Sequence, residues 1–259
     1  MRLLFTFIRY NLNAHLANLP NLLAGALGMF VNNILFLMGM WGMLFAGKAA
    51  NQPFLYYYIA LNALVMTAWG MTNFFLGGLQ EFGDLIVNGT FESKLSTPRH
   101  PLILVSTHSL YPPALGDLVM GLTAILIVAV WGPPGMGVRT LLATIFSTFG
   151  FLALYITSGS VAFFVQRGNM VAMLIRETTV SLCTFPMGKV FPSGMGRILL
   201  LTTPAAAIAI LPMDWIETAG RQVLVYTTLA VVVLLVFALW FYGIGVKRFQ
   251  ALNQIGVQS

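Results

Sequence analysis

Long apolar stretches separated by short polar segments recur along the whole chain. A helix needs about 20 mainly apolar residues to cross the hydrocarbon core of a bilayer, and six stretches have about that length or more. We therefore predict six transmembrane helices, at Leu22–Ala46, Phe54–Leu76, Leu102–Trp131, Leu141–Val165, Met170–Lys189 and Val223–Val246.

Two further apolar segments do not fit this pattern. In residues 1–20, apolar side chains recur at helical spacing with arginine and asparagine opposite them, which predicts an amphipathic helix lying in the membrane interface. In residues 186–212, the apolar run Ile198–Leu211 is short for a span, is broken by Pro204 and ends before Pro212. Because proline interrupts helices, we predict a re-entrant or interfacial hairpin between spans five and six.

The composition supports an all-α integral membrane protein. Of 259 residues, 58% are hydrophobic and only 8% are charged, whereas a soluble domain is about 25% charged. A soluble fold of this length could not hide so much apolar surface. No repeat or flexible linker divides the sequence, so we expect residues 1–259 to form a single transmembrane domain in contact with membrane lipid.

The distribution of basic residues predicts the orientation. The net charge of +6 is spread over isolated bases, without the basic run typical of nucleic-acid-binding proteins, so no nucleic acid partner is expected. An even number of spans places both termini on one side. If that side is the cytoplasm, seven bases outside the spans lie inside and five lie outside. The positive-inside rule therefore favours cytoplasmic termini.

Motifs for ATP binding and catalysis are absent from the sequence. In a P-loop the lysine follows glycine and precedes serine or threonine, whereas Gly47-Lys48 precedes alanine and Gly188-Lys189 precedes valine. His15, His100 and His108 are not spaced as metal ligands on one helix. We therefore expect no enzyme activity and no cofactor in this chain, and ATP-driven transport would need ATP and Mg²⁺ bound by another subunit.

A few polar residues lie within the predicted spans, where ionisable groups are costly and often functional. Asp117 follows a predicted helix break at Pro112-Pro113, and Arg176 and Glu177 lie in span five. Each is a candidate gate, substrate contact or proton relay. The alternatives are a structural ion pair or a span boundary that lies elsewhere. Asn62 and its neighbouring asparagines in spans one and two either join helices or line a polar path.

Charge gathers between spans two and three, in residues 79–100, which we call the charged segment. Four apolar side chains at helical spacing share this segment with four charged ones, which predicts an amphipathic helix able to bind a groove on a partner. The alternative is an ordinary solvated loop. The apolar face comprises Phe82, Leu85, Ile86 and Phe91, and the polar rim comprises Glu81, Asp84, Glu92 and Lys94.

The charged segment resembles the first cytoplasmic loop of type-2 ATP-binding cassette (ABC) exporter permeases, where a short coupling helix follows span two. The matching residues are Gly89, Leu95, Pro98, Pro101 and Leu102. A single Leu95 stands where that family has two leucines. The family has a re-entrant segment on the outer face, and the resemblance implies the same location for residues 186–212. The matching residues are Phe185, Pro186, Phe191, Pro192, Pro204, Ala205 and Pro212. The basic exit from its last span resembles Tyr242–Asn253, so the resemblance extends over the whole chain.

The resemblance implies a permease subunit of an ATP-driven exporter in a bacterial inner (plasma) membrane. It implies two P-loop ATPase subunits as partners and a second permease subunit, either another copy or a related chain. The coupling helix would dock an ATPase, with Ile86 and Phe91 as the expected contacts, among the residues Phe82, Asp84, Leu85, Ile86, Gly89, Phe91 and Glu92. The alternatives are a secondary transporter or channel without an ATPase, or a lipid-modifying membrane enzyme.

Overall fold

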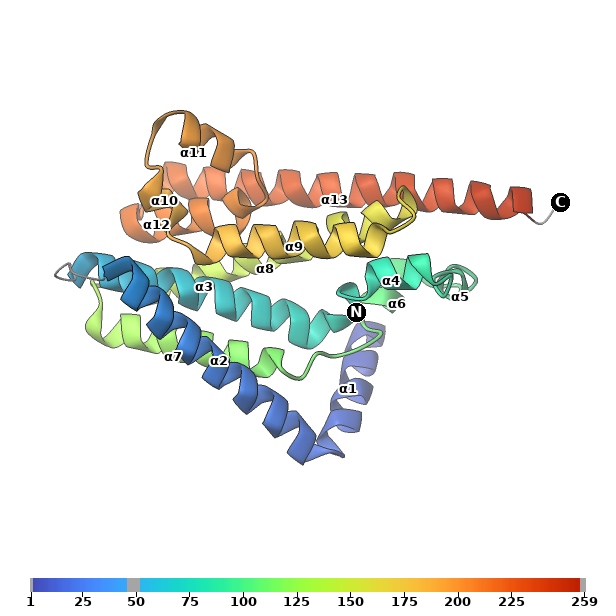
Figure 1. Ribbon diagram of the computed structural model, residues 1–259, viewed down its shortest axis with the longest axis horizontal. Helices are drawn as coiled ribbons and strands as arrows, with labels where there is room; N and C mark the ends of the chain where they lie inside the picture. The colour runs from blue at the N-terminus through green and yellow to red at the C-terminus, as the bar shows by residue number, and fades with distance from the viewer. Residues whose placement is uncertain (1, 46–51, 257–259) are drawn as a thin grey trace.

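The computed structural model describes residues 2–45 and 52–256, and all the secondary structure in these residues is helical (Figure 1). This confirms the predicted all-α membrane class. Six described helices correspond to the six predicted spans, and they are α2 (Leu19–Phe45), α3 (Gln52–Leu76), α7 (Ala114–Trp131), α8 (Met136–Ser160), α9 (Gly168–Thr184) and α13 (Arg221–Gly256).

Five of these helices, all except α9, are long and apolar enough to cross a membrane. The α9 helix has 17 residues and is therefore about 26 Å long, slightly less than the roughly 30 Å of a hydrocarbon core. It is shorter than the predicted fifth span because the chain turns extended at Phe185. The preceding loop and Pro186, which cannot continue a helix in the ordinary way, confine α9 to its observed length.

The predicted third span is divided into two helices. Its first part forms the short helix α6 (Pro101–Ser106), and its second part is α7. The interruption ends at the predicted break, Pro112-Pro113. Prolines lack a backbone N–H, so a helix cannot easily continue through them, but they are tolerated where a new helix begins, and Pro113 is the residue just before α7. As a result Asp117 lies in the first turn of α7 rather than deep inside a continuous helix.

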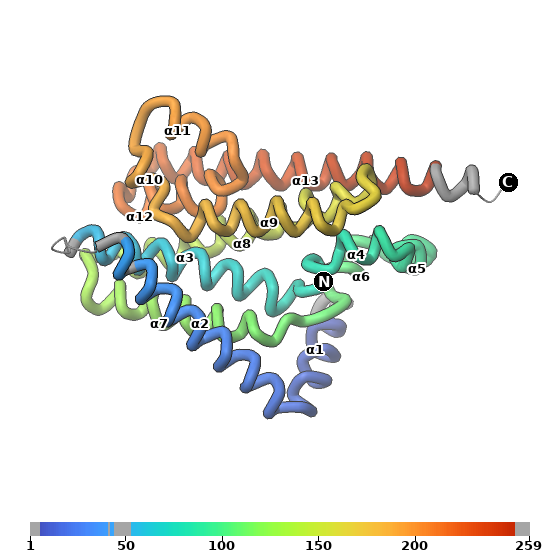
Figure 2. Tube along the Cα trace, in the orientation of Figure 1, coloured from blue at the N-terminus to red at the C-terminus, as the bar shows by residue number. Residues whose placement is uncertain are grey.

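The predicted re-entrant hairpin is present. The chain passes from α10 (Met187–Val190) through α11 (Gly194–Leu201), bends by 100° next to Pro204, and returns through the π-helix η3 (Ala206–Ile210) and α12 (Leu211–Thr218). Figure 2 shows α10 and α12 close to the same end of the molecule.

The return limb continues beyond Pro212, where the sequence predicted the end of the hairpin. A proline inside a helix disturbs the carbonyl group four residues earlier, and here that group belongs to Ile208. The side-chain hydroxyl of Ser147 on α8 donates to the Ile208 carbonyl oxygen at 2.5 Å. The π-helix and this hydrogen bond together accommodate the proline, so α12 extends to Thr218.

The remaining short helices lie opposite the hairpin. The α1 (Arg2–Leu16), α4 (Phe82–Val87), α5 (Glu92–Leu95) and α6 helices gather at one end, and the C-terminal part of α13 extends beyond them (Figure 1). We call this the α4 end, and the opposite one the hairpin end. Residues 2–16 form the predicted N-terminal helix. Its place in the membrane interface and the cytoplasmic location of the α4 end stay predictions.

The centre of the bundle is α3, which packs closely against α7 and α8. Glycines bring these backbones together, because a Cβ atom at Gly70 would lie 2.6 Å from the Leu118 backbone nitrogen. The α2 helix packs on α7, whereas α9 packs on α8. The α9 helix also contacts α3.

Candidate functional site

A cleft of about 350 Å³ opens between α2, α3, α7 and α9. We call it the Asp117 cleft. One part of its wall is apolar and the other carries amide, hydroxyl and carboxyl groups. It is lined by Met29, Asn32, Asn33, Phe36, Val65, Met66, Trp69, Asp117, Glu177, Val180, Ser181 and Thr184.

Asp117 is the buried carboxyl group of this cleft, with 5% of its surface exposed. Its Oδ1 accepts a hydrogen bond of 2.7 Å from Nδ2 of Asn33 on α2. Its Oδ2 is buried without a hydrogen-bond partner among the described residues. The position in the first turn of α7 favours a negative charge, because the positive end of the helix dipole lies there. One of the two carboxylate oxygens thus has its hydrogen-bonding capacity unused within the described residues.

Arg176 and Glu177 are neighbours in the sequence but serve different surroundings. Glu177 lines the Asp117 cleft. Arg176 instead donates from Nη1 to the Gln80 carbonyl oxygen at 3.0 Å, and its guanidinium lies 5.4 Å from the ring centre of Tyr155. The alternative of an ion pair between the two residues is not seen in the described part of the chain.

The buried asparagines have separate roles. Asn33 joins α2 to α7 through Asp117 and also lines the Asp117 cleft, so it combines features of both predicted alternatives. Asn62 is fully buried, but its Nδ2 donates to the Tyr58 carbonyl oxygen one turn earlier on α3, at 3.0 Å. The Asn62 side chain therefore donates a hydrogen bond within its own helix rather than to a neighbouring one.

The charged segment folds into α4, a tight turn and α5. The turn depends on Gly89, whose φ of +74° lies in the left-handed region that glycine adopts without steric cost. The backbone N–H of Phe91 then donates to the Leu85 carbonyl oxygen at 2.9 Å. This reversal brings the Phe91 ring to 5.7 Å from the Phe82 ring, measured between centroids.

Phe82 and Phe91 are fully buried in an aromatic cluster with three residues from distant parts of the chain. The Phe91 centroid lies 5.4 Å from that of Phe163 and 5.8 Å from that of Phe249. The Phe82 centroid lies 5.9 Å from that of Tyr242. Aromatic rings at these separations attract one another beyond the effect of burial alone. The cluster therefore anchors the charged segment to η2 (Val161–Phe163) and α13.

This anchoring corrects the predicted orientation of the docking face. Phe82, Ile86 and Phe91 are buried within the chain, so Ile86 and Phe91 are not accessible to an ATPase, and Leu85 is only partly exposed. The accessible apolar side chain is Val87, with 42% of its surface exposed. We call the surface around it the Val87 face, whose other exposed residues are Asp84, Asn88, Gly89, Thr90, Glu92 and Ser93.

Two long-range hydrogen bonds connect the charged segment to α9. Nδ2 of Asn169 donates to Oδ1 of Asp84 at 2.8 Å, and Arg176 donates to the Gln80 carbonyl oxygen. The backbones are also close, because a Cβ atom at Gly83 would lie 3.0 Å from the Cα atom of Asn169. The same helix that contacts α4 therefore also lines the Asp117 cleft through Glu177.

The hairpin end contains two ion pairs that sequence reasoning missed. Nζ of Lys189 lies 2.6 Å from Oε1 of Glu217 and 4.7 Å from the ring centre of Tyr57, and Arg197 pairs with Asp214. The partners are 28 residues apart in the first pair and 17 in the second, so no helical spacing signals them. They tie α10 and α11 to α12 and hold the hairpin closed.

The prolines and aromatics predicted for the hairpin mark its turns. Phe185 and Pro186 follow the end of α9, and Phe191 and Pro192 are exposed between α10 and α11. Pro204 lies at the bend and Pro212 at the start of α12.

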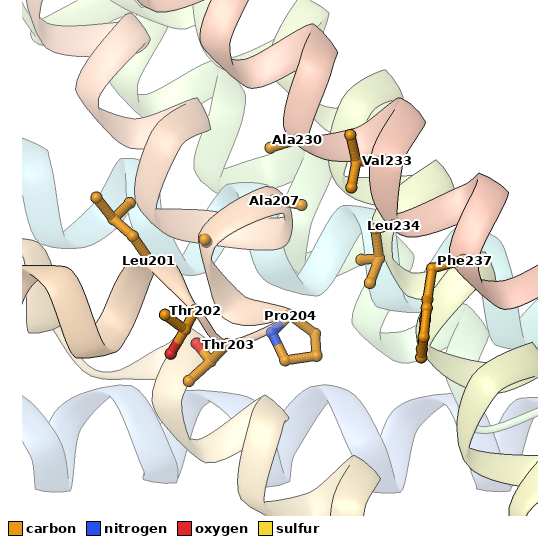
Figure 3. Close-up of a pocket in the computed structure, with 10 residues that line it drawn as sticks. Leu201, Thr202, Thr203, Pro204, Ala207, Ala230, Val233, Leu234 and Phe237 are labelled. Atoms are coloured by element: carbon orange, nitrogen blue, oxygen red, sulfur yellow. The ribbon is translucent and has the colours of Figure 1, made fainter.

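A second, mainly apolar cleft of about 360 Å³ lies between this bend and α13. Figure 3 shows Leu201, Thr202, Thr203 and Pro204 on one side of it and Val233, Leu234 and Phe237 on the other. In the described residues, no group of three or more histidine, cysteine or acidic side chains could hold a metal ion. Of the two clefts, the Asp117 cleft has the more varied lining, because it alone includes carboxyl and amide side chains.

Comparison with known protein families gives a match that covers most of the chain. A family model described as "ABC-2 family transporter protein" matches residues 27–252, which include the Asp117 cleft, the charged segment and the hairpin. No curated protein and no solved structure matches the chain.

Proposed function

The chain belongs to the ABC-2 family of transporter proteins, and from this we propose that it is the permease subunit of an ATP-driven exporter in a bacterial inner membrane. Two P-loop ATPase subunits supply ATP hydrolysis, and both termini of the permease lie in the cytoplasm with the α4 end. The missing P-loop in the sequence supports the assignment of ATP and Mg²⁺ to these partners.

A second permease subunit, either a copy of this chain or a related one, completes the translocation path at the Asp117 cleft. The α2 helix supports this arrangement, because only 11% of the residues in its most apolar stretch are buried within the chain. Lipid alone could cover an apolar face, but this face adjoins a cleft with two carboxyl groups and two asparagines. Such polar groups are costly next to lipid and favourable beside a path.

The observation that carries the proposal is the double role of α9. This helix holds the charged segment through Asn169 and Arg176 and lines the cleft through Glu177. An ATPase bound at the Val87 face would therefore move α4 and α9 together when ATP binding closes the two ATPase subunits on each other. A partner drives such a change only if it contacts the two states differently. The Val87 face is where such a partner can bind, because it is exposed while the opposite side of α4 is buried within the chain.

Purification of the chain from its native membrane tests this proposal. A P-loop ATPase, identified by its sequence, is expected to remain bound in a mild detergent at a fixed ratio to the permease. A secondary transporter or channel, or a lipid-modifying enzyme, would purify without it. Consistent recovery of the folded chain without any P-loop protein would contradict the proposal.

A further inference from the structure

The chemistry of the Asp117 cleft points to its ligand, and we propose that it binds lipophilic organic cations. This inference rests on the proposed function and adds the class of substrate to it. It is carried by three features of the cleft, namely its charge, an unpartnered buried oxygen and its apolar wall.

The ionisable side chains that line the cleft are all acidic. Its lining residues include the carboxyl groups of Asp117 and Glu177 and no lysine, arginine or histidine. Arg176, the base next to Glu177 in the sequence, is occupied by the Gln80 carbonyl oxygen and the Tyr155 ring. A cation that enters the cleft therefore meets two negative groups from two different helices, α7 and α9, and no competing positive group among the lining residues.

Asp117 is held ready for such a cation. Asn33 fixes Oδ1 at 2.7 Å, while Oδ2 is buried without a partner in the described chain. A buried acceptor left without a partner costs about 1–3 kcal/mol, and a cationic ligand would remove part of that cost. If Asp117 served only to join α2 and α7, the neutral amide of an asparagine would meet the same need without a charge.

The rest of the cleft suits an apolar ligand body. Met29, Phe36, Met66, Trp69 and Val180 line it, and its volume of about 350 Å³ falls in the range of small-molecule sites. Aromatic rings attract cations through their faces, and thioether side chains adapt to irregular shapes. A hydrophilic ion such as ammonium would gain little from this wall, whereas a cation carrying aromatic or alkyl groups would fill it.

Equilibrium binding to the full chain in lipid nanodiscs, without ATPase or nucleotide, tests the inference. The probes are radiolabelled tetraphenylphosphonium and the smaller benzyltrimethylammonium, with neutral triphenylphosphine oxide for comparison. Wild-type protein is expected to bind at least one cation, and Asp117→Asn is expected to weaken that binding about tenfold. The substitution keeps the shape of the side chain, so binding of the neutral probe is expected to remain unchanged.

Matched variants separate charge in the cleft from charge elsewhere. Glu177→Gln is expected to weaken cation binding, whereas Glu81→Gln, which removes an exposed carboxylate outside the cleft, is expected to leave it unchanged. The inference is overturned if neither cation binds, if Asp117→Asn binds them as wild type does, or if it weakens the neutral probe equally. Retention of the ATPase is measured separately, so the proposed function can stand when this inference fails.

Discussion

Replacing Phe91 with alanine is expected to detach the charged segment and to lower the free energy of unfolding by about 3–5 kcal/mol, the usual cost of deleting a buried phenylalanine ring. The effect is large because Phe91 is fully buried and faces the rings of Phe82, Phe163 and Phe249 at once. Thermal unfolding in detergent measures the loss, and hydrogen exchange of residues 82–95 locates it.

Val87→Ala is the matched control for this experiment. Val87 lies in the same charged segment, at the end of α4, but is 42% exposed, so its truncation is expected to change stability by less than about 0.5 kcal/mol. Equal stability of the Phe91→Ala protein and the wild type, with normal protection of the segment from exchange, would show that the aromatic cluster is not its anchor.

Replacing Arg176 with alanine is expected to disconnect the charged segment from the cleft. The guanidinium bridges α9 to the Gln80 carbonyl oxygen, and hydrogen bonds from charged groups contribute about 1.5–3 kcal/mol. Coupling free energies between sites are typically about 1–3 kcal/mol, or 5–150-fold. The loss of this one hydrogen bond is of the same size, so it is expected to remove a large part of the coupling between the charged segment and the cleft. Asn169 and Asp84 remain, but they join only the first turn of α9 to α4.

Ser181 lines the cleft and is exposed. A Ser181→Cys variant therefore reports whether the charged segment is coupled to the cleft, and the substrate need not be known. Its labelling rate in the permease–ATPase complex is expected to change when ATP is added. Arg176→Ala is expected to reduce this change at least fivefold while the ATPase stays bound. Arg167→Ala removes an exposed base from the residue before α9 and should preserve the change. An undiminished response in Arg176→Ala would contradict the role given to this arginine.

Much of the fold could be predicted because its signals are local. Apolar stretches of membrane length predict the spans, and prolines set the breaks at Pro112-Pro113 and Pro204. The hairpin extends past Pro212 for a reason that is not local. Ser147 is 61 residues away from the Ile208 carbonyl group that it satisfies, and only the folded arrangement of α8 and η3 brings them together.

The candidate sites were predicted less completely. The amphipathic pattern of the charged segment correctly separates apolar from polar side chains, but it does not say what the apolar face will meet. Here it meets Phe163, Tyr242 and Phe249 of the same chain, which leaves the opposite face for a partner. The pattern would be the same if the partner bound the apolar face directly.

Polar pairs between residues far apart in the sequence could not be predicted either. Asp117 is a candidate by its place in an apolar run, but its partner Asn33 is 84 residues earlier and nothing in either local pattern connects them. Arg176 and Glu177 look like one unit in the sequence. On a helix, adjacent side chains point about 100° apart, and here that separation assigns one residue to the charged segment and the other to the cleft.

The central claim is that a P-loop ATPase docks on the Val87 face, and site-specific crosslinking in native membranes tests it most directly. The native Cys183 is fully buried, so engineered cysteines are the reactive thiols. Val87→Cys is expected to form a crosslink to a P-loop ATPase identified by mass spectrometry. Val190→Cys, which is 58% exposed at the hairpin end, is expected to form none. A stably folded Val87→Cys protein that never crosslinks to the ATPase, or equal crosslinking from both positions, would contradict the account.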